Sequence, residues 1–359
     1  MESVAVVGGG VIGLACAWRL AAAGHRARLV DPEPARGASW IAGGMLAPLT
    51  ESWPGEEAAL DLGADALERW PSFAADLGFE LRREGTLVLA VDSADAATLD
   101  VLADFLAARG RAVERLTGRA ARKLEPCLGP RVRSGLSVPG DLAVDNRALL
   151  AALLRACASA GVEFVTASAV SVRPGAVETA ESTVECDVVV VAAGAFSRSL
   201  HPALAGLVRP VKGEILRLRA RPGTLPPPSR TVRALVASRP VYLVPRSDGS
   251  LVLGATQQEV GYDTEVTAGG VRDLIADAEQ VLPGVGEYAL VETAAGLRAG
   301  SPDNVPVLGW LEPGVLAATG HHRNRLLLAP TTADAVLALV GGGAAPEAAS
   351  PARFRKGVQ

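Results

Sequence analysis

Arg298, Arg323 and Tyr242, all in the second half of the chain, are suited to holding a small carboxylate. A guanidinium is planar and can bind a carboxylate through two parallel hydrogen bonds, and a tyrosine hydroxyl can add a third. Arg298 follows the small and apolar residues 294–297, which favours a buried position over the more common surface ion pair. We therefore expect Arg298 to line a cavity. Arg323 could anchor the same ligand or position a cofactor.

The direction of the Tyr242 side chain depends on the element that carries it. Residues 241–245 and 251–255 are rich in Val and Leu, and Ser-Asp-Gly at 247–249 separates them, a pattern typical of a β-hairpin. Successive residues of a strand point to opposite faces, so Tyr242 shares a face with Val244 and not with its sequence neighbours. That face could meet a cavity or an ordinary core. No Ser/His/Asp or Cys/His arrangement is readable, and we assign no general base.

The first thirty residues carry a dinucleotide-binding pattern, GxGxxG followed by an acid. Gly8 permits a tight turn, Gly10 lets a pyrophosphate approach the backbone, and Gly13 lets a helix pack close to a strand. The amino terminus of that helix attracts phosphates, and Asp31 can accept hydrogen bonds from ribose hydroxyls. The pattern alone does not separate FAD from NAD. The surrounding elements are a Val-rich strand at 3–7, a helix at 14–23 that stops before Gly24, and a second strand at 27–30.

Two kinds of structure alternate along the rest of the chain. The first and last parts have an α/β pattern, whereas the middle is richer in hairpins, so a nucleotide domain with an antiparallel β-rich insert fits best. The segment 38–51 is apolar without being periodic, and such a small-residue loop suits close approach to a flat ligand. Further helices are expected at 56–78, 94–109, after Asp145 and at 271–281, and further strands at 83–91 and 187–193.

The composition excludes several classes of protein. The 359 residues are 49% hydrophobic and 21% charged, as in a folded globular protein. A net charge of -4 with a pI of 5.7 argues against nucleic-acid binding. No stretch reaches the roughly 18 apolar residues of a membrane span, and the run at 3–24 lacks the basic start of a signal peptide. We expect a cytoplasmic protein with reduced cysteines and no metal, because no Cys/His cluster has metal-ligand spacing.

Five segments occur together in a specific order: Gly8–Gly13 with Asp31, Ala38-Ser39 with 43–48, 241–246, 296–298, and 320–330. In this order they resemble the D-amino-acid oxidase superfamily and, within it, the glycine oxidases. The resemblance covers nearly the whole chain, from Val4 to about Val340. Gly-Met-Leu-Ala-Pro and His-x-Arg-Asn are the specific segments, because GxGxxG is shared with many flavoproteins.

This resemblance implies an α/β fold in which a Rossmann-like FAD-binding domain is joined to an antiparallel β-rich substrate domain. We expect residues 1–80, 141–208 and 300–343 to form the discontinuous FAD-binding domain, 81–140 and 209–299 the substrate domain, and 344–359 a loose tail. In monomeric sarcosine oxidases a late cysteine holds the flavin. No cysteine follows Cys186 here, so we expect non-covalent FAD.

The resemblance also implies the roles of individual residues. Tyr242, Arg298 and Arg323 are expected to face the substrate. Flavin contacts are expected from Gly8, Gly10, Val11, Ile12, Gly13, Asp31, Pro32, Ala38, Ser39, Gly43, Gly44, Met45 and Val170, and from the loop His321, His322, Arg323, Asn324, Arg325, Leu326 and Leu327.

Four positions depart from the pattern of similar family members. Arg325 stands where a Gly usually follows the Arg-Asn pair. If that backbone is left-handed, Arg325 is strained, and if not, it adds a long cation near the flavin or its entrance. His322 replaces a common Tyr or Phe, and Ala299 and Asn304 replace a common Pro and Gly. These departures bear on substrate preference and on activity.

The activity implied is FAD-dependent oxidative deamination of glycine, and of sarcosine or small D-amino acids, by molecular oxygen to an imine or glyoxylate with hydrogen peroxide. The imine would supply thiazole formation in thiamin biosynthesis. The alternatives are a D-amino-acid oxidase or dehydrogenase, a sarcosine oxidase-like enzyme with another amine or electron acceptor, an NAD-dependent dehydrogenase, and a flavin-binding partner protein without catalysis. We expect no nucleic-acid or membrane partner, and a homo-oligomer of unspecified size.

Overall fold

The computed structural model describes residues 1–111 and 113–354. A six-stranded sheet in the order β18-β19-β12-β1-β2-β8 carries the amino terminus. Its strands are parallel from β19 to β8, and only β18 runs antiparallel to its neighbour. The bounds are β1 Ser3–Val7, β2 Arg26–Val30, β8 Glu163–Val165, β12 Val188–Val191, β18 Val307–Glu312 and β19 Val315–Thr319.

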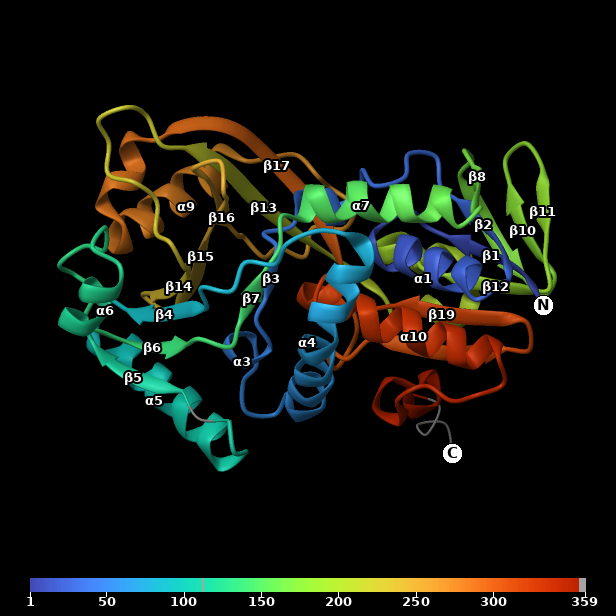
Figure 1. The fold of residues 1–359 in the computed structure, drawn as a ribbon, viewed down its shortest axis with the longest axis horizontal. Coiled ribbons are helices and arrows are strands. Elements are labelled where there is room, and N and C mark those ends of the chain that lie inside the picture. Colours follow the sequence, from blue (N-terminus) through green and yellow to red (C-terminus); the bar gives the residue numbers. More distant parts are fainter. Residues whose placement is uncertain (112, 355–359) are drawn as a thin grey trace.

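Three helices cover this sheet, and α1 (Val11–Ala22) contacts the other two, α7 (Asn146–Ser159) and α10 (Ala329–Val340), as Figure 1 shows. The buried face of α1 meets Leu149 and Val336 in one apolar cluster with the sheet. The carboxylate of Asp145 caps α7 by accepting two backbone N–H groups, as its sequence position predicts. Parallel strands connected through covering helices form the Rossmann-like part of the predicted α/β fold, which is confirmed.

The second large sheet has eight strands in the order β17-β13-β16-β15-β14-β4-β6-β5. All of its pairings are antiparallel except that of β14 with β4. Its strands are β4 Thr86–Ala90, β5 Glu114–Thr117, β6 Ser134–Val138, β13 Arg209–Arg219, β14 Thr231–Val236, β15 Arg239–Pro245, β16 Ser250–Gly254 and β17 Ala289–Gly300.

The two faces of this sheet have different neighbours. On one face Val241 and Leu243 join a core with α9 (Ala268–Val281). On the opposite face Val244 lies in a smaller cluster against which Tyr242 and Met45 pack. The alternation predicted for residues 241–245 is therefore confirmed, and the Tyr242 face meets the segment that follows residue 38.

The remaining elements link or flank the two sheets. Residues 38–51 contain two one-turn helices where a loop was expected. The sequence did not predict these helices, because a four-residue helix is too short to show a hydrophobic period. The linking and flanking helices and strands have the following bounds: α2 Ala38–Ile41, β3 Met45–Leu46, α3 Pro48–Glu51, α4 Glu57–Leu77, α5 Ser93–Ala108, α6 Gly118–Leu124, β7 Leu142–Ala143 and α8 Ser197–Leu200. A small three-stranded sheet consists of β9 Ala169–Arg173, β10 Ala176–Thr179 and β11 Thr183–Glu185.

The strands of each sheet come from separate parts of the chain. The six-stranded sheet uses residues within 3–30, 163–191 and 307–319, and the eight-stranded sheet uses 86–138 and 209–300. The division into two domains itself stays a prediction.

The end of the chain differs from the expected loose tail. Short 3-10 turns span Glu347–Ala349 and Pro351–Phe354, and Ala349 is 1% exposed. Arg353 forms an ion pair with Asp303, with 2.8 Å between Nε and Oδ2, and donates to the carbonyl of Val305. This anchoring explains why residues up to 354 pack against the body despite a Gly/Ala/Pro-rich composition. Residues 355–359 of the predicted tail lie outside the described residues.

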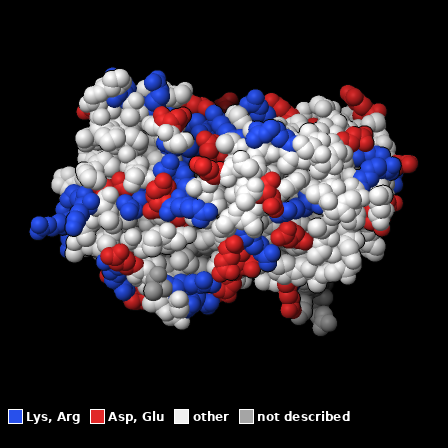
Figure 2. Space-filling view, in the orientation of Figure 1, with Lys and Arg blue, Asp and Glu red and all other residues white. Residues whose placement is uncertain are grey.

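Basic and acidic side chains are interspersed on the face shown in Figure 2, and they form no extended field of one sign there. Among the described residues, no helix combines the length and the apolar character needed to cross a lipid bilayer. The four cysteines are free, and burial raises the pKa of the Cys127 thiol to about 11.

Candidate active site

The glycines that precede α1 allow close packing of the backbone. Gly8 has a φ of 108°, and a β-carbon there would lie 2.5 Å from the carbonyl oxygen of Ala192 in the neighbouring segment. A β-carbon on Gly13 would overlap the carbonyl of Gly8. Both positions therefore require glycine, as the dinucleotide-binding pattern predicts.

Asp31 and Ser39 organise the turn at the start of α1. Asp31, at the end of β2, accepts hydrogen bonds from the backbone N–H groups of Gly9 at 2.6 Å and Glu33 at 2.8 Å. Each carboxylate oxygen keeps a lone pair for a ribose hydroxyl. The hydroxyl of Ser39 accepts from the N–H of Val11 at 3.1 Å. The turn, the acid and the start of α2 thus converge at one end of the sheet.

A cavity of about 380 Å³ lies between the eight-stranded sheet and the segment 38–53. This volume is at the low end of the ~300–1,000 Å³ usual for small-molecule sites. The cavity brings together most of the candidate substrate and flavin-ring residues. Those that line it are Ala38, Gly43, Gly44, Met45, Tyr242, Arg298, His322, Arg323, Arg325 and Leu326.

Tyr242 is held between two glycines. A β-carbon on Gly43 would lie 2.7 Å from Cε2 of the ring, and one on Gly254, its partner across β15 and β16, would lie 2.8 Å from the same atom. Burial raises the pKa of the Tyr242 hydroxyl above its ordinary value, and the nearby Arg298 guanidinium opposes this shift. The hydroxyl is therefore protonated at neutral pH and available as a hydrogen-bond donor.

Arg298 reaches the same face of the sheet. It pairs with Val211 across β17 and β13, and its guanidinium extends over Gly213, where a β-carbon would lie 2.5 Å from Cζ. Its Nη1 donates to the carbonyls of Lys212 at 3.4 Å and Thr256 at 3.2 Å. These bonds orient the guanidinium and leave further N–H groups for a ligand.

Arg323 lines the cavity, but acidic and backbone groups already hold its guanidinium. Its Nη2 donates to the carbonyl of Glu51 at 2.7 Å and to the carboxylate of Glu56. Glu56 in turn accepts from the side-chain amide of Asn304 at 2.9 Å. Arg323 is therefore neutralised by a neighbour, unlike Arg298.

The backbone of the loop 322–325 shows whether Arg325 is strained. The left-handed residue is His322, with a φ of 47°, whereas Arg325 ends a right-handed 3-10 turn and carries no backbone strain. The strain considered for Arg325 is thus excluded. Arg325 instead extends into the cavity, and its Nη2 donates to the carbonyl of Ala38 at 2.7 Å.

Both histidines of this loop are neutral. Burial lowers the pKa of His321 to about 3, and its Nε2 lies 2.9 Å from the hydroxyl of Thr332. Burial, with four nearby arginines, also lowers the pKa of His322 to about 3. Neither imidazole carries a charge at physiological pH, so neither neutralises the cavity.

Asn146, fully buried, fixes the segment that faces the cavity. Its side-chain amide donates to the carbonyls of Ser39 at 2.9 Å and Trp40 at 2.7 Å. Its oxygen accepts from Arg217 and Arg246, each at 3.2 Å. One side chain therefore connects α2, α7 and the large sheet.

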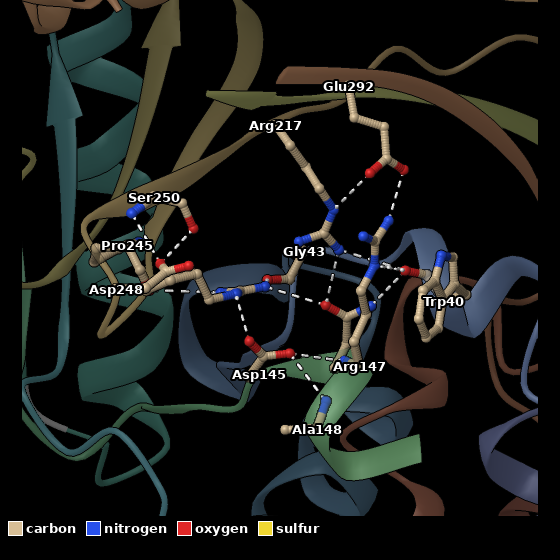
Figure 3. Close-up of polar contacts among 12 residues, drawn as sticks. Trp40, Gly43, Asp145, Arg147, Ala148, Arg217, Pro245, Asp248, Ser250 and Glu292 are labelled. Carbon is tan, nitrogen blue, oxygen red and sulfur yellow. Dashed lines mark hydrogen bonds and ion pairs between the residues drawn. The ribbon is translucent and has the colours of Figure 1, made fainter. Parts of the chain in front are cut away.

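A second layer of polar contacts surrounds Trp40. Figure 3 shows Arg147 and Arg217 both pointing to Glu292, and the Arg147 to Glu292 ion pair measures 2.6 Å. The guanidinium of Arg147 also stacks on the Trp40 ring at 4.3 Å from its centroid. Arg246 adds a 2.8 Å bond to the carbonyl of Gly43. These contacts hold 40–43 in place.

Two acidic residues near the cavity were not predicted from the sequence. Glu51, almost fully buried, forms an ion pair with Arg233 at 2.7 Å, and both line the cavity. Asp141 lies close by and accepts from the hydroxyl of Thr50 at 3.2 Å, and burial raises its pKa to about 7. A single Glu at the end of a one-turn helix gives no sequence signal. Gly213, inside the long strand β13, is a residue whose type could have marked a close approach, because glycine is uncommon inside a strand.

Other candidates lie away from the cavity. Val170 is 59% exposed on β9 of the small sheet, and Pro32 is exposed beyond β2. Leu327 is buried, and its carbonyl accepts from the Trp70 indole at 2.8 Å. Among the described residues, no group of three or more His, Cys, Asp or Glu side chains is arranged to hold a metal.

Two features fit a flavin dinucleotide. Gly10 at the N-cap of α1 has no side chain that could cap the helix, so the first-turn N–H groups after Val11, whose N–H is bonded to Ser39, remain for a pyrophosphate. At the cavity end, buried polar atoms have no hydrogen-bond partner in the described part of the chain: both ring nitrogens of His322, Oδ1 of Asn324 and Nε of Arg325. Such orphaned atoms are rare in native proteins and indicate a ligand.

Comparison with known proteins agrees with this geometry. Residues 3–339 match the FAD dependent oxidoreductase (DAO) family. The glycine oxidase of Geobacillus kaustophilus is 33% identical, over 94% of this chain and 92% of that protein. A crystal structure of glycine oxidase from G. kaustophilus aligns with a TM-score of 0.87, covering 95% of both chains. The glycine oxidase of Pseudomonas putida is 32% identical, over 95% of each chain.

The chain also matches longer proteins. It is 33% identical to the bifunctional protein ThiO/ThiG of Synechocystis sp., over 94% of this chain. It spans about half of that protein, 51% of its length. The family match extends across the Rossmann-like sheet, the β-rich sheet and the residues that line the cavity, and the chain belongs to the FAD dependent oxidoreductase (DAO) family.

Proposed function

We propose that this protein oxidises glycine and related small amino acids with bound FAD. The proposal rests mainly on the position of Arg298 and Tyr242. Both side chains lie on one face of the large sheet and line a single cavity, together with the segments 43–45 and 322–325 that are expected to contact the flavin. The relatives named glycine oxidase support glycine as the substrate.

The chain's own residues would orient the substrate. Arg298 would bind the carboxylate through the N–H groups left free by Lys212 and Thr256, and the Tyr242 hydroxyl would donate a further hydrogen bond. A bound ligand would displace water from around these groups, which strengthens charge-assisted contacts. Among the described residues that line the cavity, Glu51 is the one carboxylate, and Arg233 holds it, so we propose that the amine reacts in its neutral form.

Bound FAD would supply two-electron oxidation of the C–N bond to an imine, with molecular oxygen as the final acceptor and hydrogen peroxide as the product. Gly8, Gly10, Gly13 and Asp31 would hold the dinucleotide. The remaining residues of the flavin set, apart from Arg325, are proposed to hold it along its length. The bond to FAD is proposed to be non-covalent, because no cysteine follows Cys186.

Cellular context extends the proposal. The ThiO/ThiG relatives support a role in supplying the imine for thiazole formation in thiamin biosynthesis. Free cysteines support a reducing compartment such as the cytoplasm. A homo-oligomeric state and the absence of a membrane partner stay predictions.

The test is a peroxide and oxygen-consumption assay on the yellow purified protein with glycine, sarcosine, D-alanine and D-proline. We expect oxidation of glycine with one peroxide per oxygen consumed. A flavin that glycine does not reduce under anaerobic conditions would remove glycine from the proposal. A colourless folded protein that FAD cannot reconstitute would refute the whole assignment.

A further inference from the structure

The cavity contains more positive charge than one substrate carboxylate requires. Four arginines line it: Arg233, Arg298, Arg323 and Arg325. Arg233 is paired with Glu51 at 2.7 Å, and Arg323 is paired with Glu56. Arg298 and Arg325 form no ion pair within 4.0 Å with any carboxylate of the described residues. Two guanidinium groups are therefore uncompensated.

Arg325 has the unsatisfied donors expected of an anion-binding residue. Its Nη2 donates to the carbonyl of Ala38 at 2.7 Å and its Nη1 to the carbonyl of His322 at 3.4 Å. Its Nε is shielded from solvent and has no hydrogen-bond partner among the described residues. Burial and the nearby Arg298 lower the pKa of Arg325 to about 10, which still leaves it cationic at neutral pH.

Two like charges in one cavity repel each other, and the buried guanidinium of Arg325 also costs desolvation free energy until an anion neutralises it. One glycine carboxylate carries one negative charge and leaves one of the two positive charges uncompensated. The imidazole of His322 is neutral and adds no negative charge. A second anionic group on the ligand would satisfy Arg325 and would also remove the repulsion between the two arginines.

We propose that the cavity selects small amino acids with a second carboxylate, with Arg298 binding the α-carboxylate and Arg325 the other. This inference rests on the proposed amine oxidation and specifies its substrate class. Arg325 is then a specificity-determining residue, on a backbone whose right-handed turn positions its side chain without strain.

Two matched pairs of amines test the proposal on the FAD-loaded enzyme. Iminodiacetate differs from sarcosine, and D-aspartate from D-alanine, by one carboxylate in place of a hydrogen. We expect kcat/KM for the dicarboxylate to exceed that for its partner at least tenfold in one pair or both. In Arg325→Gln this ratio falls at least tenfold, and in Arg325→Lys it is largely retained. Arg272→Gln, on an exposed arginine of α9, should leave the ratio unchanged.

A binding measurement provides a second readout. Malonate should perturb the flavin absorption spectrum at a concentration at least tenfold lower than acetate does, and Arg325→Gln should abolish this difference. Equal affinities for the two acids in the wild-type protein, or a preference that survives in Arg325→Gln, would overturn the inference. Loss of flavin from Arg325→Gln with an unchanged preference would make Arg325 a cofactor contact and also overturn it. Failure to oxidise any amine, with malonate still preferred, would refute the proposed function alone.

Discussion

The guanidinium of Arg298 lies over Gly213 of the adjacent strand, in space that a β-carbon at Gly213 would fill, 2.5 Å from Cζ. Gly213 pairs with Gly296 across β13 and β17, so neither strand presents a side chain beneath the arginine. The reach of Arg298 into the cavity thus depends on two residues that have no functional group of their own.

Gly213→Ala should displace the guanidinium and raise KM for glycine at least tenfold, because the added methyl group overlaps the Arg298 head group. Steady-state kinetics would measure the change. Gly269→Ala is the matched control, since a β-carbon there meets nothing within 4 Å. Unchanged kinetics in Gly213→Ala would mean that Arg298 does not act from this position.

Arg298→Ala should raise KM for glycine by about 10- to 100-fold, the equivalent of the ~1.5–3 kcal/mol of a hydrogen bond to a charged group. The protein should stay yellow, because Arg298 lies on the large sheet, away from the dinucleotide turn. Arg298→Lys keeps the charge and loses the planar fork, so its KM should lie between those of the wild type and of Arg298→Ala. An unaltered KM in Arg298→Ala would remove this residue from the site.

Tyr242→Phe removes one hydroxyl and keeps the ring between its two glycines. We expect kcat/KM for glycine to fall by roughly fivefold, in keeping with ~1 kcal/mol for a single hydrogen bond. Because burial raises the pKa of Tyr242, its ionisation should produce no inflection in the wild-type pH profile up to about pH 9. A profile with such an inflection that is lost in Tyr242→Phe would contradict this.

Asp31→Ala should weaken FAD retention, since the carboxylate both organises the turn at Gly9 and offers its lone pairs to ribose. The absorbance near 450 nm after dialysis, compared with circular dichroism of the same sample, separates cofactor loss from unfolding. Asp65→Ala on the exposed side of α4 is the control for removing one acid. Full FAD occupancy of Asp31→Ala would refute the role.

The raised pKa of Asp141 predicts that the stability of the protein depends on pH. Burial raises its pKa to about 7, so the folded state keeps a proton that the unfolded chain releases near pH 4. The contribution of Asp141 to the free energy of unfolding should therefore decline between about pH 4 and pH 7, by up to about 1.4 kcal/mol per pH unit. His321 and His322 contribute with the opposite sign, because their lowered pKa values add stability as pH rises, so the comparison with Asp141→Asn isolates the part due to Asp141. Asp141→Asn mimics the protonated acid and should become more stable than the wild type as pH rises.

Urea unfolding of the FAD-saturated protein at pH 5, 6, 7 and 8 checks this expectation. The difference between Asp141→Asn and the wild type should grow with pH. The control, Asp61→Asn, removes a carboxylate from the exposed side of α4. A difference that is constant across this range would show that Asp141 is ionised throughout.

Short sequence patterns predicted the features whose function depends only on nearby backbone atoms. The turn at Gly8 and Gly13, the acid at the end of β2 and the cap at Asp145 each act through the adjacent backbone, so a short window of sequence identifies them. The direction of Tyr242 followed from strand alternation alone.

Contacts between distant segments could not be predicted in this way. The pairing of Glu51 with Arg233, and of Arg323 with Glu56, joins residues far apart in the chain, and nothing in their neighbours marks the partner. Arg325 was ambiguous because its effect depends on a single φ angle. The left-handed backbone at Asn304, with a φ of 60°, shows the same limit, since Asn adopts this conformation more readily than most residues in place of glycine.

The left-handed position of the 322–325 turn belongs to its first residue, a histidine, and not to its last. Position 325 can therefore carry side chains of different charge without left-handed strain, while position 322 resists β-branched replacements. A substitution at position 325 would change the charge that lines the cavity and leave the backbone geometry of the surrounding turn as it is.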